Sequence, residues 1–510
     1  MKKIFALIAS LALVAPLVFT SCATSDSVAK SGGVKKVKPK KFVQADFDSA
    51  VARGDLDDAL SMTVGRKYAK NDVIIQKMDI AMMRHFTGDW AGSAAYLNSA
   101  NEDIKNAVTQ SLAKGAVAAL GNENAKEYAG AIYESHFLNV FNSLNYYNRG
   151  DLESAVALMK DLAQKRVMYD MVALAVANES DDEAEKEAAA DAAESDKKGK
   201  SKGSSKSASA AASSLNVDMN AVNRRSPPKP TEADVFSDSA LERYVALNYY
   251  TMQLLDRSTP IEVRGIAEQE VAQQGALFAL RAPDYDMQAD ISVPDGMGRV
   301  NVLAFSGLVG RRREHATYFP GDFISGMQFL PPVRVGDFTI PAFRLKFVYP
   351  EFIRQPKKIQ RVTAVIGGEE IELAILEDLD NDVWMDVNVK AYKAFKRSVF
   401  RSILKKSAAI AAGSASIYAS AQISDALANV AVLGVSAAID AVDAAETADI
   451  RQVMALPASA NAGGVSLEPG TYPVQVRYFD AGGRLVEEEN LGNVTVRANK
   501  LVLLESLCIR

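Results

Sequence analysis

The sequence predicts an α+β protein in which an N-terminal array of helices is followed by a β-rich part. Three observations support this fold class. Residues 46–178 repeat apolar side chains at helical spacing, whereas several segments after residue 298 alternate apolar and polar side chains as strands do. The breaks between the helices also recur at nearly regular intervals. With 510 residues and two cysteines, the chain is long enough to bury a large core without disulfides.

The first residues have the pattern of a secretory signal. Two lysines precede an uncharged apolar run over residues 4–18, which is too short for a membrane-spanning helix. The segment Phe19–Cys22, Phe-Thr-Ser-Cys, resembles the lipobox of bacterial lipoproteins. This resemblance implies that Cys22 becomes the mature N-terminus and carries acyl chains, which together anchor a protein stably in a membrane. The lysine-rich residues 23–41 then form a flexible tether or spacer.

Glycine followed by Asp or Asn breaks the helical region at Gly54, Gly88, Gly121 and Gly150. The intervals are 34, 33 and 29 residues. Glycine ends one helix and the following polar residue caps the next. The pattern resembles degenerate tetratricopeptide repeats, which are pairs of antiparallel helices with a period of 34. A plain helical bundle with the same turns is the alternative.

A stacked array of helix pairs has a concave face that can bind another protein. Tyr146, Tyr147 and Arg149 lie at one of the turns and are the candidate partner-binding residues. Helical pattern resumes from Ser239 toward Ala282, so we assign that segment to the same array. Residues 179–232 separate the two parts, and their acidic and then basic low-complexity sequence predicts a disordered insertion.

The C-terminal half combines strands with an unusual helical region. Gly367-Gly368 separates two apolar runs and predicts a β-hairpin. The helix that follows carries a cationic stripe of Arg397, Arg401 and Lys405, which we expect to pair with acidic residues of the fold. Residues 407–439 then contain a single charge and many small side chains. We interpret them as a closely packed, buried helical hairpin, with membrane insertion as the alternative.

Few residues have the spacing that chemistry requires. His85, His136 and His315 lack metal-type spacing, and no HExxH, CxxC, Walker or GxSxG motif occurs. The run Asp378–Asp382 begins like a calcium loop but has valines where that loop needs Gly and Glu, so we interpret it as a helix start. The cluster Arg311–Arg313 is either a solvated loop tip or a grip for a carboxylate, phosphate or anionic glycan. We expect no enzyme activity, cofactor or metal.

The last third of the chain carries short motifs in a recognisable order: an arginine-bearing helix, an Ala-rich hairpin, Asp-x-Arg…Leu-Pro and a Gly-containing β segment. The matching residues are Arg397, Arg401, Ala448-Asp449-Ile450-Arg451, Leu456-Pro457 and Leu467-Glu468-Pro469-Gly470-Thr471-Tyr472. In this order they resemble an uncharacterised family of bacterial lipoproteins with tetratricopeptide-like N-terminal helices. The resemblance implies an envelope location and this architecture, and it implies no reaction.

These patterns together predict a membrane-anchored lipoprotein that acts as a protein-binding scaffold or assembly factor in the cell envelope, facing the periplasm from the outer membrane. The net charge of −5 argues against a nucleic-acid partner. A glycan-acting protein, which would need paired carboxylates, and a membrane-inserted component are the alternatives. The predicted segments are a signal peptide (1–21), a lipidated tether (22–41), helical repeats (42–178 and 233–284), the insertion (179–232), a β-rich segment (285–382), a long helix with an Ala-rich hairpin (383–456) and a C-terminal β segment (457–510).

Overall fold

The structure is a computed structural model that describes residues 35–113, 128, 130–177, 186, 208–231, 234, 238–321 and 329–510. It confirms the α+β class, because helices dominate the N-terminal half and a sheet-rich part with antiparallel strands follows. The signal segment, Cys22, most of the tether, Gly121 and the first part of the charged insertion lie outside the described residues.

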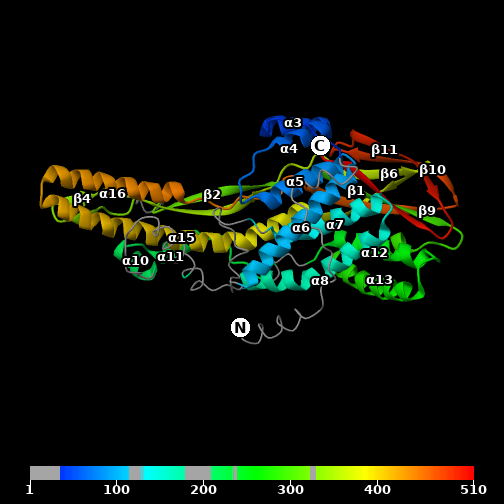
Figure 1. Cartoon of the computed structure of the whole chain (residues 1–510), viewed down its shortest axis with the longest axis horizontal. Coiled ribbons are helices and arrows are strands. Elements are labelled where there is room, and N and C mark those ends of the chain that lie inside the picture. Colours follow the sequence, from blue (N-terminus) through cyan, green and yellow to red (C-terminus); the bar gives the residue numbers. More distant parts are fainter. Residues whose placement is uncertain are drawn as a thin grey trace.

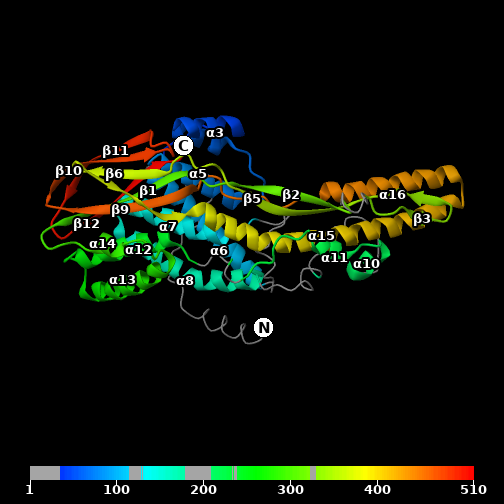
Figure 2. The same cartoon turned by 180° about the vertical axis from the view of Figure 1, so that it is seen from behind.

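Within the described residues, three helix pairs follow the predicted turns. They are α3 (Gln44–Arg53) with α4 (Leu56–Gly65), α5 (Val73–Phe86) with α6 (Trp90–Ala113), and α7 (Ile132–Asn148) with α8 (Leu152–Ala177). The array continues with α12 (Ala240–Leu255), α13 (Ile261–Arg281) and α14 (Met287–Ile291). Helices α5 to α8, α12 and α13 lie side by side and cover one side of the sheets (Figures 1 and 2).

The glycine turns have the backbone geometry that the sequence predicts. Gly54, Gly88 and Gly150 adopt φ angles of +77°, +71° and +82°, a conformation that favours glycine. The aspartate after each glycine accepts a hydrogen bond of 3.0–3.1 Å from the backbone N–H three residues further on, which caps the next helix. The helix boundaries predicted at these three turns are therefore confirmed.

The described C-terminal part contains two four-stranded sheets. The first has the spatial order β12 (Leu501–Cys508), β1 (Gly298–Leu308), β9 (Pro457–Leu467) and β8 (Ala374–Asp378). The second has the order β11 (Leu485–Val496), β10 (Gly470–Phe479), β6 (Arg361–Ile366) and β7 (Glu369–Glu372). The predicted hairpin at Gly367-Gly368 is confirmed as β6–β7. The predicted C-terminal β segment supplies four strands, β9 to β12, and both β9 and β12 pair with the distant β1.

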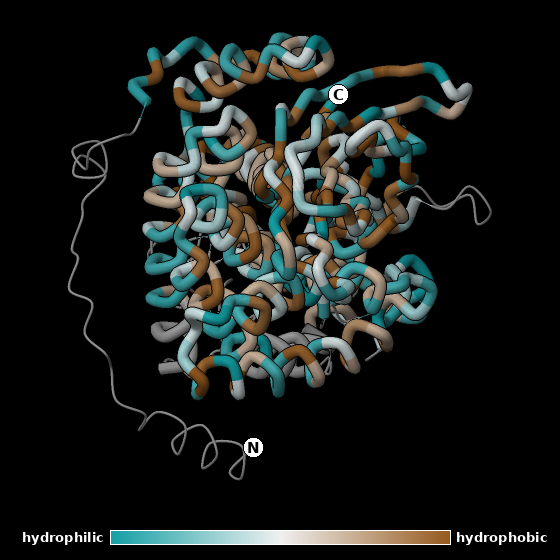
Figure 3. The backbone as a smooth tube through the Cα atoms, turned by 90° about the vertical axis from the view of Figure 1, so that its right-hand side faces the viewer, coloured by the Kyte–Doolittle hydropathy of each residue, from teal (hydrophilic) through white to brown (hydrophobic). Residues whose placement is uncertain are grey.

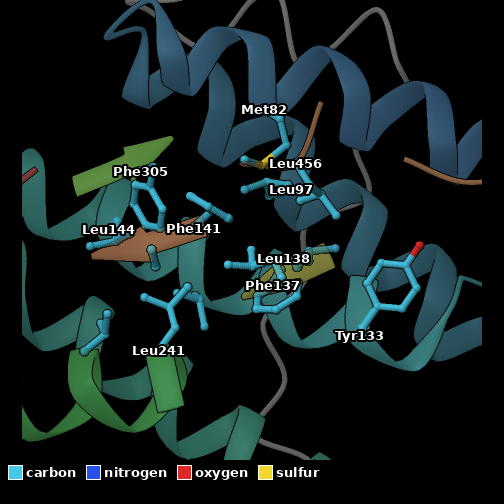
Figure 4. Packing of buried hydrophobic residues seen from close by; sticks show 14 of the residues in the cluster. Met82, Leu97, Tyr133, Phe137, Leu138, Phe141, Leu144, Leu241, Phe305 and Leu456 are labelled. Atoms are coloured by element: carbon cyan, nitrogen blue, oxygen red, sulfur yellow. The ribbon is translucent and has the colours of Figure 1, made fainter. Parts of the chain in front are cut away.

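One hydrophobic core joins the array to the first sheet. Phe137 and Phe141 of α7 belong to the same buried cluster as Phe305 of β1 and Leu456 (Figure 4). The rings of Phe141 and Phe305 have centroids 5.1 Å apart, a contact worth roughly 1 kcal/mol beyond the area it buries. Viewed along the long axis, apolar stretches gather where the helices and strands face one another (Figure 3). The array is therefore one wall of a shared core.

A long helical hairpin projects from this body (Figures 1 and 2). Helix α15 (Leu379–Ala421) has 43 residues and is about 65 Å long, and α16 (Asp425–Ala445) runs back along it. Two ribbons accompany the hairpin, β2 (Arg311–Phe319) with β5 (Leu345–Ile353) and β3 (Val333–Val335) with β4 (Phe338–Ile340). We call residues 407–445 together with β3 and β4 the arm.

The exposure of the arm corrects the prediction of a buried hairpin. Only Ala428, Val435 and Ile439 of α16 are buried, and they face α15 and the β3–β4 ribbon. None of the described elements covers the opposite side of α16. The small side chains do allow a close approach, because a Cβ added to Gly413 of α15 would meet Val435 at 2.1 Å. The helices therefore pack closely against each other, but not inside the body.

The end of the charged insertion is more ordered than the sequence predicts. Helices α10 (Ala208–Ser214) and α11 (Met219–Asn223) precede α12, and α10 packs against α15. The reason is that Leu215, Val217 and Val222 bury their side chains in the cluster beside the arm. The prediction of disorder up to residue 232 is thus wrong for residues 208–231.

Candidate interaction surfaces

The predicted partner-binding residues lie at the end of α7, where the array meets β12. The Tyr147 hydroxyl accepts a hydrogen bond of 3.0 Å from the backbone N–H of Leu503, so this side chain is engaged within the chain. Tyr146 accepts 3.0 Å from Asn98, and the Arg149 guanidinium stands 5.5 Å from the Tyr146 ring centroid. Arg149 is exposed and Tyr146 is partly buried. Partner binding by these residues stays a prediction, with Tyr147 fixed by the fold.

The histidines make contacts that hold the fold. His85 Nε2 lies 2.5 Å from Glu505 of β12, and His136 Nδ1 lies 3.1 Å from Glu242 of α12. Burial alone would lower the pKa of His85, but the Glu505 carboxylate and the hydrogen bond with Asn145 together outweigh burial, so the pKa is raised. His315 of β2 stacks on the ring of Tyr349 in the neighbouring strand β5 and is partly exposed. Among the described residues, no group of three or more His, Cys, Asp or Glu side chains is placed to hold a metal ion.

Residues 447–456, which we call the strap, connect the arm to β9 and lie against the array. Glu134 of α7 accepts a hydrogen bond of 2.8 Å from the backbone N–H of Val453. Asp79 of α5 accepts one of 2.8 Å from Met454. Both carboxyl groups are fully buried. Two helix pairs of the array therefore hold the segment by which the chain returns from the arm.

The strap contains the Asp-x-Arg motif that carries the family resemblance. Arg451 forms an ion pair of 2.9 Å with Asp449. It also lies 3.4 Å from Asp72, the residue that precedes α5 of the array. Its guanidinium also stands 5.2 Å from the ring centroid of Tyr128. The motif thus has a structural task, which is to fasten the strap. Sequence reasoning missed this task because Asp72 and Tyr128 are more than 300 residues away from Arg451 in the chain.

The cluster Arg311–Arg313 is not the loop that the sequence predicts. It begins strand β2, so alternate side chains point to opposite faces. Arg312 is buried and forms an ion pair of 2.8 Å with Asp386 of α15, whereas Arg311 is partly exposed and Arg313 is exposed. The helix-start interpretation of Asp378–Asp382 is confirmed, because α15 begins at Leu379 with two aspartates in its first turn.

A pair of carboxyl groups meets where β8 joins α15. Glu377 and Asp382 are 7% and 1% exposed, and burial raises the pKa of both groups. The neighbouring Glu377 carboxylate raises the pKa of Asp382 further, against the opposing effect of Arg281, which lies 3.6 Å from Asp382. Glu377 accepts hydrogen bonds from the Ser239 hydroxyl at 2.6 Å and from Leu241 N–H at 2.8 Å, which fixes the start of α12. A polysaccharide would have no access to this buried pair.

The side of α16 that faces away from α15 is exposed and apolar. Ile423, in the turn before α16, is 76% exposed. Within α16, we call Ala426, Val430, Leu433 and Ala437 the apolar seam. All four are exposed, and the exposed fractions of Val430 and Leu433 are 64% and 70%. They recur at alternating intervals of three and four residues, as in a helix that packs along a second helix. A surface helix ordinarily places polar residues on this side.

Among the described helices, α16 also satisfies the length and apolarity that a membrane span requires. Its charged residues are Asp425, Asp440 and Asp443, and it contains no lysine or arginine.

Ion pairs join the two helices where the arm meets the body. Arg401 and Lys406 of α15 pair with Glu446 and Asp443 at 2.7 and 2.6 Å. The predicted pairing of the cationic stripe within the fold is thus confirmed at Arg401.

The chain has no match among protein-family models, curated proteins or solved structures. The fold and these surfaces define a class in physical terms: an α+β protein with a packed body and a projecting helical arm whose outward face is apolar.

Proposed function

We propose that the protein is a lipid-anchored scaffold of the bacterial cell envelope, which binds an α-helix of a partner protein along the apolar seam of its arm. The exposed seam is the observation that carries the proposal. Contiguous exposed apolar surface on a folded protein marks an interaction site, because burying it upon association is favourable. The signal pattern and Cys22 support anchoring at a membrane.

The spacing of the seam supports a helical partner. Residues at intervals of three and four form one narrow stripe on a helix, and such a stripe inserts between the side chains of a second helix. Gly434 lies beside the stripe, and a Cβ built on it would have no neighbour within 4 Å. A partner helix could therefore approach α16 closely at this point.

The charges of α16 distinguish between three possible binding partners of the apolar seam: a membrane surface, a second copy of α16 and a helix of another protein. Helices that lie on membrane surfaces are rich in lysine and arginine, whereas α16 carries three aspartates only. Two copies of α16 packed together would bring Asp425 and Asp440 of each copy near one another, which is unfavourable. A partner helix with an apolar stripe and basic flanks would satisfy both the seam and the aspartates.

The ion pairs and hydrogen bonds that connect the arm to the body support a scaffold role for the arm rather than that of a flexible extension. Glu446 is 1% exposed and binds Arg401, while the side chain of Lys406 is fully buried and binds Asp443. Directly after Glu446, the strap is hydrogen-bonded to the array. A load on the arm would therefore be transmitted to the body and, through the tether, to the membrane anchor.

The test places a photo-crosslinking amino acid at Val430 of the full-length protein in cells. We expect one or a few envelope proteins to be captured, at segments that have apolar spacing of three and four residues. Leu433→Glu should reduce capture more than tenfold, because a charge would be buried in the interface. Ser416→Glu, which adds the same charge to an exposed position of α15, is the control and should leave capture unchanged. Capture of lipid or of a second copy alone would contradict the proposal.

Anchoring is tested separately by labelling with palmitate. The wild type should incorporate the label and Cys22→Ala should not. Loss of the anchor without loss of crosslinking in a detergent extract would show that the anchor locates the scaffold and does not form its binding surface.

A further inference from the structure

A second candidate surface lies on the body, where α3 meets the end of β1 and the last residues of the chain. A hollow of about 360 Å³ is formed there, within the range of pockets that hold small ligands. Phe47 and Val51 of α3 line it together with Met454 of the strap and Ile509. It shares no residue with the apolar seam, so it is independent of the function proposed for the arm.

Four cationic side chains from three distant parts of the sequence line this hollow: Arg311, Lys357, Lys358 and Arg510. Among its described lining residues, Asp48 has the single acidic side chain. We call the hollow the basic pocket. Four positive charges around one hollow repel one another, so an anion placed among them would be attracted.

The partners of these cations leave part of the charge uncompensated. Arg311 binds Asp48 at 2.5 Å, within the pocket wall. Lys357 lies 2.7 Å from Asp378, which is outside the lining. Lys358 is exposed and forms no ion pair with any residue that the structure describes. Lys358 is therefore the cation best placed to receive a ligand.

The position of Arg510 depends on a glycine turn of the array. Its guanidinium lies against Gly54, and a Cβ added to that glycine would approach the guanidinium Nη2 to 2.4 Å. Arg510 also forms an ion pair of 2.6 Å with Glu487. The C-terminal end of α3, which carries the negative end of the helix dipole, favours a cation at this position. The wall of the pocket is thus ordered by the fold.

We propose that the basic pocket binds a phosphate or carboxylate group that is joined to a small apolar moiety. The cations would bind the anionic group, with Arg311 able to offer two parallel N–H donors. Phe47, Val51, Met454 and Ile509 would contact the apolar part. Such a group occurs both in soluble molecules and in lipid headgroups.

The test is calorimetric titration of the full-length chain carrying Cys22→Ser with n-hexyl phosphate, inorganic phosphate and 1-hexanol. Hexyl phosphate should bind saturably and more tightly than inorganic phosphate, because only it has an apolar part. Its affinity should fall several-fold when salt is raised from 50 to 500 mM, as screening weakens attraction between exposed charges. Hexanol that binds as well as hexyl phosphate, or no saturable binding of hexyl phosphate, would overturn the proposal.

Two lysine variants make the test specific. Lys358→Glu should weaken hexyl phosphate binding at least tenfold, since it replaces an attraction by a repulsion. Lys229→Glu is the matched control, because Lys229 is an exposed lysine outside the pocket lining. Equal affinities of the two variants would overturn the proposal. Arg311→Gln should also weaken binding of hexyl phosphate, and it tests a second cation of the pocket lining.

Vesicles distinguish the source of the anion. Binding to vesicles that contain phosphatidic acid, absent with pure phosphatidylcholine and lost in Lys358→Glu, would assign the pocket to a lipid headgroup. Binding of hexyl phosphate without such vesicle binding would assign it to a soluble ligand.

Discussion

The carboxylate of Asp79 accepts a hydrogen bond of 2.8 Å from the backbone N–H of Met454, a residue that follows 375 positions later in the chain. Asp79 belongs to the helical array and Met454 to the strap that returns from the arm. The Tyr68 hydroxyl donates to the same carboxylate at 3.0 Å, and Arg66 lies 3.3 Å away. This contact fastens the strap to the array.

Asp79 should make stability fall as pH rises through the weakly acidic range. Burial raises the pKa of this carboxyl from 3.8 to about 6, against the opposing effect of Arg66. Between these two values the unfolded chain has lost the proton and the folded chain has not, so the free energy of unfolding decreases with pH. The shift corresponds to about 3 kcal/mol. Urea unfolding of Asp79→Asn should lack this decrease, whereas Asn in place of the exposed Asp57 should retain it.

The pair of His85 and Glu505 should have a pH dependence over a higher range. Because the folded-state pKa of His85 is raised above its ordinary 6.5, its contribution is complete below that pH and is lost as pH rises through the folded-state pKa. Glu505→Gln removes the charge that raises the pKa. The difference in unfolding free energy between wild type and Glu505→Gln should therefore shrink from pH 6 to pH 9. A difference that stays constant over this range would contradict the assignment.

Arg401→Ala should destabilise the base of the arm. It leaves the Glu446 carboxylate, which is 1% exposed, without its ion-pair partner. Loss of one partner of a buried pair costs about 3–5 kcal/mol. Lys405→Ala removes a neighbouring charge that is less buried and should cost under about 1 kcal/mol. Limited proteolysis within the arm, together with thermal unfolding, measures both variants. Equal protease resistance would show that the pair does not fix the arm.

Two glycines of the arm should respond to substitution in opposite ways. A Cβ on Gly413 would meet Val435 at 2.1 Å, so Gly413→Ala should separate α15 from α16 and cost roughly 1–3 kcal/mol. Gly434 has no neighbour within 4 Å, and Gly434→Ala should stabilise the free protein by up to about 1 kcal/mol through helix propensity. If a partner helix packs at Gly434, the same variant should also reduce crosslinking from Val430. Thermal unfolding and the crosslinking assay separate the two effects.

Several features could be predicted from the sequence because their causes are local. The turns at Gly54, Gly88 and Gly150 follow from glycine and the aspartate beside it, and the β6–β7 hairpin follows from Gly367-Gly368. The helix start after Asp378 was predicted for the same reason.

The exposed surface of the arm and the basic pocket could not be predicted from local sequence patterns. The sequence shows that residues 407–439 carry a single charge, but a buried hairpin and an exposed arm have the same apolar pattern. The pattern of Arg311–Arg313 likewise does not say that Arg312 is buried against Asp386 while Arg311 lines a pocket.

The sequence by itself determined the α+β class, the helix pairs and the secretory pattern with Cys22, since each depends on residues that are close together in the chain. Only the tertiary structure decided that Tyr147 is engaged by β12, that the strap binds the array and that α16 faces outward. The physical reason is that burial and ion pairing depend on what else packs at a point in space. That neighbour is often hundreds of residues away, as Met454 is from Asp79.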